Sequence, residues 1–354
     1  VLQVETTLDP DLQRFLLDRI DRDNSRHVGI VVMEAATGRV LAMAGYDRFD
    51  PNGNPCLQSQ FPAASIFKVV TAAAAVDRLG YGADSPVHFS GPKHTLYKRQ
   101  LTDRVDRYTT TIPLREAFAD SVNPVFGKLG GLRLRKPLLE QSAAAFGFNQ
   151  PLGFDLPCPP SRFQVGDEPY NWAEAASGFN NDTTISPLHG AMIASAVLNG
   201  GRMATPSIIE RVVDERGTPV YRRQTQTPPR QAMSPRAAAA LGQMMEETIA
   251  SGTARKTFRR HRKDQVLARL QIGGKTGSID NATHEVRYDW FVGFARERAG
   301  GRQLVVSVMV GHQKYIGTRA TDYALMALSQ YFANPAARNA LSTASRTGSA
   351  LPST

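Results

Sequence analysis

The sequence lacks long apolar runs, and this absence limits what the chain can be. No stretch of its 354 residues approaches the ~18 consecutive apolar residues that a membrane-spanning helix requires. No basic segment followed by an apolar one opens the chain, so a signal peptide is not expected at its start. Beginning at Val1, the chain is expected to be a mature ectodomain or an excised piece whose signal or anchor lies outside this sequence.

Cysteine is also scarce. The two cysteines, Cys56 and Cys158, have neither a metal-ligand spacing nor a Cys-x-x-Cys pattern, so no metal site is predicted. Two alternatives remain for them, two free thiols or one disulfide. An oxidising compartment permits the bridge, whereas sequence does not show how close the two Cα atoms lie. Of the two, we favour the disulfide.

Acidic residues are in the minority. Against 42 Lys and Arg there are 32 Asp and Glu, which gives a formal charge of +10. Much of the excess lies in residues 255–264, RKTFRRHRKD, where six Lys and Arg accompany one acid. Such a run is ordinarily a solvated loop or helix end, and the alternative is a patch for anionic lipid headgroups or an acidic polymer. Nucleic acid is not an expected partner, because no recognition motif and no interleaved stacking aromatics accompany the run.

The β-rich segments lie at the two ends of the chain. Residues 28–46 read as a hairpin, and three further β-rich runs occupy 266–312, whereas 80–235 is mostly helices and loops. This split predicts an α+β fold with a central antiparallel sheet of about five strands, flanked by helices and joined to a largely helical lobe. We expect one domain over 1–335 and a flexible tail over 336–354.

Three short sequence strings carry residue types that are common in catalytic sites. Ser65 and Lys68 stand three apart at the start of the apolar helix predicted over 61–80, so they share a face. Ser121-Val-Asn123 falls at a junction between two helices, where Ser and Asn often serve only as caps. Lys275-Thr276-Gly277 lies in the first C-terminal strand, where the glycine alone would indicate a bulge in an edge strand. A single such tripeptide occurs by chance in a few per cent of chains, but three in this order on suitable elements do not.

Together these strings resemble the penicillin-recognising serine acyltransferases, which comprise penicillin-binding proteins and serine β-lactamases. Further strings, among them ATGRVLAMAG, PLREAFADSVNPVFGKLG and DWFVGFA, are similar to the transpeptidase domain of penicillin-binding proteins over about residues 4–333. The resemblance implies a β-lactamase/transpeptidase-like fold and an enzyme without a cofactor. Two positions depart from the usual motifs of the family: Ala64 stands where many relatives have glycine, and Ser278 stands where threonine is more frequent.

The residue types fit acyl transfer. A serine hydroxyl is a poor nucleophile unless a neighbour removes its proton, and Lys68, desolvated by the apolar helix, is the candidate base for Ser65. Ser121 is the candidate relay of that proton to the departing amine. Asn123 offers one donor and one acceptor to hold a peptide amide.

The third string is expected to bind the substrate. Lys275 presents a cation from the strand edge, while Thr276 and Ser278 add hydroxyls for a substrate carboxylate. Gly277 lets the strand lie close to the acyl group. The resemblance further implies that the backbone amides of Ser65 and Ser278 form the oxyanion hole.

The resulting functional prediction is a D,D-transpeptidase that crosslinks peptidoglycan stem peptides and is acylated by β-lactam antibiotics. The resemblance places it outside the cytoplasm, with a membrane tether and cell-wall synthesis proteins as partners beyond this sequence. A β-lactamase is the first alternative, but residues 155–185 contain no Glu-x-x-Leu-Asn string for a deacylating base. A β-lactam sensor and an inactive scaffold are the others, and intact catalytic strings argue against the scaffold.

Overall fold

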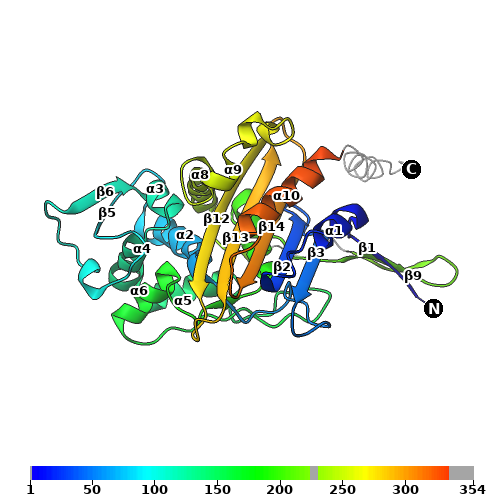
Figure 1. The fold of residues 1–354 in the computed structure, drawn as a ribbon, viewed down its shortest axis with the longest axis horizontal. Coiled ribbons are helices and arrows are strands. Elements are labelled where there is room, and N and C mark those ends of the chain that lie inside the picture. The colour runs from blue at the N-terminus through cyan, green and yellow to red at the C-terminus, as the bar shows by residue number, and fades with distance from the viewer. Residues whose placement is uncertain (1, 224–229, 335–354) are drawn as a thin grey trace, which may run out of the picture.

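A computed structural model describes residues 2–223 and 230–334, and its centre is the sheet that the two ends of the chain build together. The antiparallel strand order is β12 (Leu270–Asp280), β13 (Arg287–Glu297), β14 (Gln303–His312), β2 (Ser25–Glu34) and β3 (Val40–Asp47). Figure 1 shows the N-terminal hairpin lying beside the C-terminal strands. The predicted five-stranded sheet is confirmed. Its first C-terminal strand begins at Leu270 rather than 266, because 267–269 form a short 3-10 turn.

Both faces of the sheet are covered, and this explains the nearly continuous apolar run in β2. Helices α1 (Pro10–Leu17) and α10 (Ala320–Ala333) pack on one face, and α7 (Pro187–Leu198) and α8 (Pro235–Ala250) pack on the other. Since side chains alternate along a strand, Ile30 belongs to the core under α10, and Val31 belongs to the core under α7.

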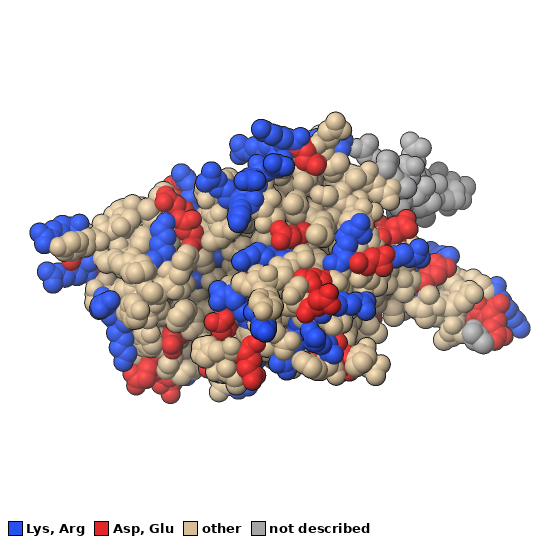
Figure 2. Space-filling model, in the orientation of Figure 1, with Lys and Arg blue, Asp and Glu red and all other residues tan. Residues whose placement is uncertain are grey.

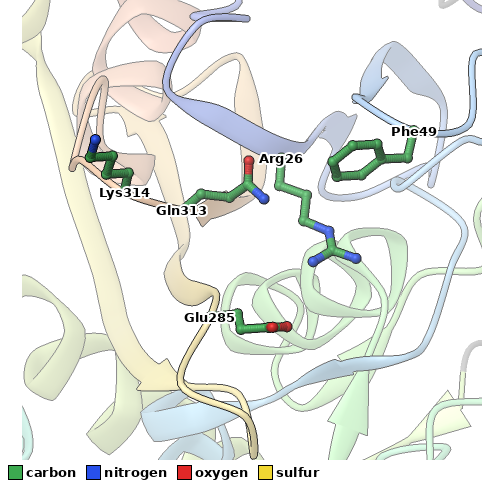
Figure 3. A pocket seen from close by; sticks show the side chains of 5 residues that line it. All are labelled: Arg26, Phe49, Glu285, Gln313 and Lys314. Atoms are coloured by element: carbon green, nitrogen blue, oxygen red, sulfur yellow. The ribbon is translucent and has the colours of Figure 1, made fainter.

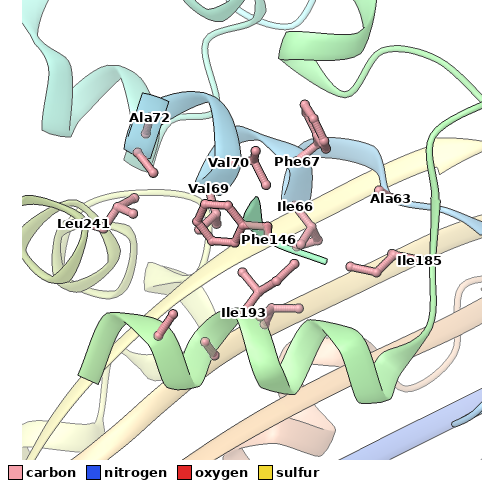
Figure 4. Close-up of a cluster of buried hydrophobic side chains, with 14 of the residues drawn as sticks. Ala63, Ile66, Phe67, Val69, Val70, Ala72, Phe146, Ile185, Ile193 and Leu241 are labelled. Atoms are coloured by element: carbon pink, nitrogen blue, oxygen red, sulfur yellow. The ribbon is translucent and has the colours of Figure 1, made fainter. Parts of the chain in front are cut away.

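The helical lobe surrounds one buried helix, α2 (Lys68–Leu79). Every side chain from Lys68 to Val76 is buried, so this part of α2 is covered on all sides, with Lys68 and Thr71 as its only polar residues. Figure 4 shows α2 packed against the buried side chains of Ile193 from α7, Leu241 from α8 and Phe146. The helix ends at Gly80, whose φ of +76° is the left-handed conformation that a C-terminal glycine adopts readily. Further helices of the lobe are α3 (Leu114–Ala119), α4 (Asn123–Lys128), α5 (Arg135–Ala145) and α6 (Pro169–Ser177), and a π-helical stretch (Leu129–Leu134) joins α4 to α5.

The region 80–235, predicted as mostly helical, also contains short strands, two of which pair with strands nearer the N-terminus. A hairpin joins β5 (Pro86–Ser90) to β6 (Thr109–Pro113), and β8 (Arg202–Met203) pairs with β11 (Arg230–Gln231). The N-terminal β1 (Gln3–Thr6) forms a three-stranded sheet with β9 (Ile209–Val213) and β10 (Pro219–Arg222), and β4 (Phe61–Pro62) pairs with β7 (Thr184–Ile185). Alternation over two to five residues is too short a pattern to distinguish such strands from loops. The β1–β9–β10 sheet projects from the body of the molecule (Figure 1).

The predicted disulfide is wrong: both cysteines are free. The fully buried Cys56 thiol donates to the Ile30 carbonyl at 3.6 Å, and the Cys158 thiol donates to the Leu57 carbonyl at 3.3 Å. Each thiol therefore has its own carbonyl partner, with Cys56 buried and Cys158 half-buried. Burial raises the pKa of Cys56 to about 12, so its thiol stays protonated at neutral pH.

The basic run at 255–264 is exposed, as predicted. It forms α9 (Arg255–Phe258) and a 3-10 turn (His261–Lys263), with every Lys and Arg of the run exposed and Phe258 buried beneath them. Figure 2 shows these basic side chains gathered along the top of the molecule. Among the helices in residues 2–223 and 230–334, none has the length and apolarity to cross a bilayer. The tail predicted over 336–354 lies outside the described residues.

Candidate active site

The turn that carries Ser65 is held in place from two sides. A 3-10 turn (Ala64–Phe67) precedes α2, and the approach to it is anchored because Trp290 Nε1 donates to the Pro62 carbonyl at 2.9 Å. The Ala63 amide also donates to the Thr183 carbonyl at 2.8 Å. Ala64 itself has a φ of +47°, a conformation that glycine adopts at lower cost. The position where relatives often have glycine is thus one where this chain places a side chain in the left-handed region.

Lys68 is completely buried and touches three oxygen atoms. Its Nζ lies 2.8 Å from Ser65 Oγ, 2.7 Å from Asn123 Oδ1 and 2.5 Å from the Ser177 carbonyl oxygen. Burial, reinforced by the nearby charge of Lys275, holds the pKa of the Lys68 ammonium well below its usual range. The predicted Ser65–Lys68 pair is therefore in contact, and its amine is biased towards the neutral form that accepts a proton.

Ser121 and Lys275 form a second pair in contact, and the charge of Lys275 is close enough to act on Lys68. Ser121 ends the turn after α3 with a φ of +56°, and Lys275 Nζ donates to its hydroxyl at 3.0 Å and to the Thr276 carbonyl at 2.9 Å. Lys275 is fully buried, and this burial lowers the pKa of its ammonium to about 7, although Asp120 raises it in part. The ammonium is buried in contact with Ser121 and is not exposed at the strand edge, as the sequence had indicated it would be.

Asn123 is more occupied than predicted. Its Oδ1 accepts from Lys68, while its Nδ2 donates to the His94 carbonyl at 3.0 Å. Its backbone amide donates to the Lys93 carbonyl at 2.7 Å, and its side chain makes no capping bond in α4. One amide hydrogen and one lone pair remain for a substrate, so Asn123 positions Lys68 in addition to any contact with a ligand.

The strand β12 brings the third string to the serine. A side chain at Gly277 would begin 3.2 Å from the Ser65 amide nitrogen, so the strand and the Ser65 turn are in close contact there. Thr276 is half-buried and Ser278 exposed, which leaves both hydroxyls within reach of solvent. Because β12 is the edge strand of the sheet, the backbone groups on its outer side have no neighbouring strand.

Two site residues escaped the sequence analysis. Ser177, the last residue of α6, supplies the carbonyl that Lys68 contacts, and Gly178 follows it with a φ of +67°. A Cβ at Gly178 would overlap the Ala64 carbonyl, so only glycine lets α6 approach the Ser65 turn this closely. A glycine after an apolar helix indicates a helix end, but nothing local shows that this end faces Ser65.

A separate hollow of about 640 Å³ lies elsewhere, lined by Arg26, Phe49, Glu285, Gln313 and Lys314. Figure 3 shows Arg26 pointing into it from beside the Phe49 ring. None of these residues contributes a hydrogen bond to the Ser65 site. Within the part of the chain that the structure describes, no three His, Cys, Asp or Glu side chains are grouped so as to hold a metal ion.

Solved structures of penicillin-binding proteins have the same fold as this chain. The chain superposes on the crystal structure of PBPA from Mycobacterium tuberculosis with a TM-score of 0.73, 24% identity, and coverage of 94% of this chain and 82% of the other. Penicillin-binding protein 3 from the same organism, complexed with aztreonam, gives a TM-score of 0.75 at 21% identity, with coverage of 93% and 79%. The predicted transpeptidase-like fold is confirmed.

The family follows from the sequence as a whole. The model of the penicillin-binding protein transpeptidase domain matches residues 28–333, and the chain belongs to this family. The chain is 27% identical to the peptidoglycan D,D-transpeptidase PbpA of M. tuberculosis H37Rv, with coverage of 87% of this chain and 67% of PbpA. It is 25% identical to the stage V sporulation protein D of Bacillus subtilis, with coverage of 88% and 50%. The resemblance stated from the three strings is thereby confirmed.

Proposed function

We propose that this protein is a serine D,D-transpeptidase that crosslinks peptidoglycan stem peptides through an acyl-enzyme on Ser65. The single observation that carries the proposal is the set of three oxygens around Lys68. Two of them, Asn123 Oδ1 and the Ser177 carbonyl, can only accept hydrogen bonds. A neutral Lys68 amine gives its two hydrogens to these acceptors, so its lone pair is directed at the Ser65 hydroxyl.

Acylation then proceeds by groups that are already in contact. Lys68 takes the hydroxyl proton while Ser65 Oγ attacks the carbonyl carbon of the D-Ala–D-Ala bond. The amides of Ser65 and Ser278 stabilise the oxyanion of the tetrahedral intermediate. Ser121 passes its hydroxyl proton to the departing amine of D-Ala and takes a proton in turn from the Lys275 ammonium, which donates to it at 3.0 Å. An amine from a neighbouring stem peptide then attacks the acyl carbon and passes its proton through Ser121 to Lys275, while the ester bond to Ser65 breaks and Lys68 returns the proton to the Ser65 oxygen. This leaves the crosslink and the free enzyme.

Substrate recognition rests on the exposed side of β12. The carboxylate of the terminal D-Ala is held by the hydroxyls of Thr276 and Ser278, and the buried Lys275 stabilises it at longer range. β-Lactams carry a carboxylate beside their reactive carbonyl and acylate the same serine. In support, PbpA of M. tuberculosis is described as an acyl-enzyme with ceftriaxone and with penicillin G.

The proposed substrate sets the location. Peptidoglycan lies outside the cytoplasmic membrane, so the protein acts there, with residues 1–335 as one catalytic domain. A membrane tether and cell-wall synthesis proteins are the proposed partners, and PbpA, which is longer than this chain, supports a further segment in the full protein.

Intact-mass spectrometry with benzylpenicillin tests the proposal. We expect one covalent adduct that persists for minutes or longer, and its loss in S65A. In the described residues no Asp or Glu carboxylate is hydrogen-bonded to Ser65, Lys68 or Ser121, which leaves no evident base for a deacylating water. Clearance of the adduct within seconds would assign the protein to the β-lactamases. A stable adduct without stem-peptide crosslinking would favour a β-lactam sensor.

A further inference from the structure

A threonine outside the three strings touches both the substrate-binding strand and the turn that holds Ser121. Thr253 follows α8, and its Oγ1 lies 2.5 Å from Thr276 Oγ1 and 3.2 Å from the Ala119 carbonyl oxygen. Its backbone amide donates to the same Ala119 carbonyl at 3.1 Å. Thr253 is exposed and Thr276 is half-buried, so this contact borders the open side of the site.

The close approach of this segment depends on the residue before Thr253. A Cβ at Gly252 would lie only 2.5 Å from the Ala119 carbonyl oxygen and 2.8 Å from the Ala119 side chain. Gly252 thus allows the chain to lie against the end of α3, two residues before Ser121. The contact between Thr253 and Thr276 consequently links the Ser121 turn to β12.

Each of the two hydroxyls has a single hydrogen, which permits two arrangements. In the first, Thr253 donates to the Ala119 carbonyl and Thr276 donates to Thr253, so Thr276 has no hydrogen left for a ligand. In the second, Thr253 donates to Thr276, and the Thr276 hydrogen is free. The Ala119 carbonyl keeps its bond from the Thr253 amide in both arrangements, so little is lost when the hydroxyl turns away.

We propose that Thr253 is a positioning residue that accepts the Thr276 hydrogen in the empty site and releases it to the substrate carboxylate on binding. The proposal rests on the function proposed above and adds a residue to its carboxylate site. An arriving carboxylate can only accept hydrogen bonds, so it favours the second arrangement. Thr253 then donates to Thr276 Oγ1 and fixes the Thr276 hydrogen towards the anion.

The test compares T253V, T253S and a matched control, T257V, in acylation by benzylpenicillin. Thr257 lies in the same segment and also pairs with a threonine, its Oγ1 being 3.0 Å from Thr321 Oγ1, away from the site. T253V should raise the dissociation constant for benzylpenicillin about tenfold, the scale of one weakened hydrogen bond to a charged group. The acylation rate constant should change less, T253S should restore most of the affinity, and T257V should match the wild type.

Two further measurements separate positioning from a structural role. With the methyl ester of benzylpenicillin, which lacks the anion, T253V and the wild type should bind alike. In the T276V background, T253V should have no further effect, because the two hydroxyls act as one unit. Should T253V not fold, T253A removes the same hydroxyl.

Failure of the inference differs from failure of the proposed function. If the wild type forms no Ser65 adduct with benzylpenicillin, both are overturned. If the wild type is acylated but T253V equals T257V, or loses as much affinity for the ester as for the acid, only the role of Thr253 is overturned. An equal loss in T253S and T253V overturns it as well.

Discussion

Replacing Gly178 by alanine tests the contact between α6 and the Ser65 turn. Gly178 has a φ of +67°, and its new Cβ would overlap the Ala64 carbonyl and lie 2.9 Å from the Ser65 amide nitrogen. The turn must therefore move, and with it both the nucleophile and the Lys68 contact to the Ser177 carbonyl.

The size of the effect comes from two separable terms. An alanine in the left-handed region costs roughly 1–2 kcal/mol of folding free energy. Overpacking adds about 1–3 kcal/mol, since the neighbours of the new Cβ at Gly178 are backbone atoms that cannot rotate away. For catalysis, a displacement of about 1 Å at reacting atoms costs on the order of 10²-fold in rate.

G80A is the matched control. Gly80 has a φ of +76°, close to that of Gly178, but a Cβ there meets nothing within 4 Å. Both variants bear the backbone cost of an alanine at positive φ, and only in G178A does the new Cβ overlap neighbouring atoms. We expect G80A to lower the free energy of unfolding by about 1–2 kcal/mol and to acylate normally. G178A should lose about 2–5 kcal/mol and about 10²-fold in acylation.

The assay is the second-order rate of benzylpenicillin acylation by intact mass, with unfolding in urea measured in parallel. If G178A acylates as fast as G80A, the packing of α6 does not position Ser65, and the reasoning is refuted. If G178A is fully folded but acylates slowly, the loss of acylation rate comes from displacement of the Ser65 turn and not from unfolding.

Three other outcomes follow. K68A should slow acylation about 10²–10⁴-fold, since a positioned base contributes that much, and an unchanged rate would mean that another group takes the Ser65 proton. K275M should be more stable than the wild type at pH 6 by urea unfolding, with a gain that shrinks towards pH 10. The pKa of Lys275 is about 7 in the folded protein and ~10.4 in an unfolded chain, so burial of the ammonium lowers the free energy of unfolding by its full amount below pH 7. This loss of stability disappears as the pH rises past about 10, where the lysine is neutral in the folded and the unfolded protein alike. A stability gain in K275M that does not depend on pH would contradict burial of the ammonium as its cause. Neutralising the basic residues of 255–264 should weaken binding to anionic liposomes in flotation assays while leaving acylation unchanged. Undiminished liposome binding would mean that the run is only a solvated surface.

Much of the fold was predictable because its signals are local. The β-rich runs at the two ends have the period and composition of strands, and they form one sheet in which Val308 of β14 pairs with Ile30 of β2. The short strands inside the helical lobe were missed, since two to five residues carry too little pattern.

The sequence by itself determined which chemical groups this protein can use and on which elements they stand. The spacing of Ser65 and Lys68 brings the two side chains together on a single helical turn, and their contact follows from that local geometry. The order of the three strings, each on a suitable element, was enough to indicate an acyltransferase.

Only the tertiary structure decided what each of these groups faces. The Ser177 carbonyl lies 109 residues from Lys68, and the Ser121 hydroxyl lies 154 residues from Lys275. Periodicity along the chain encodes which side of an element is buried, but not which carbonyl or hydroxyl of another element meets it there. The partners of the two lysines, and hence their lowered pKa values, arise from desolvation within a core that forms only when α2, α4, α6 and β12 pack together.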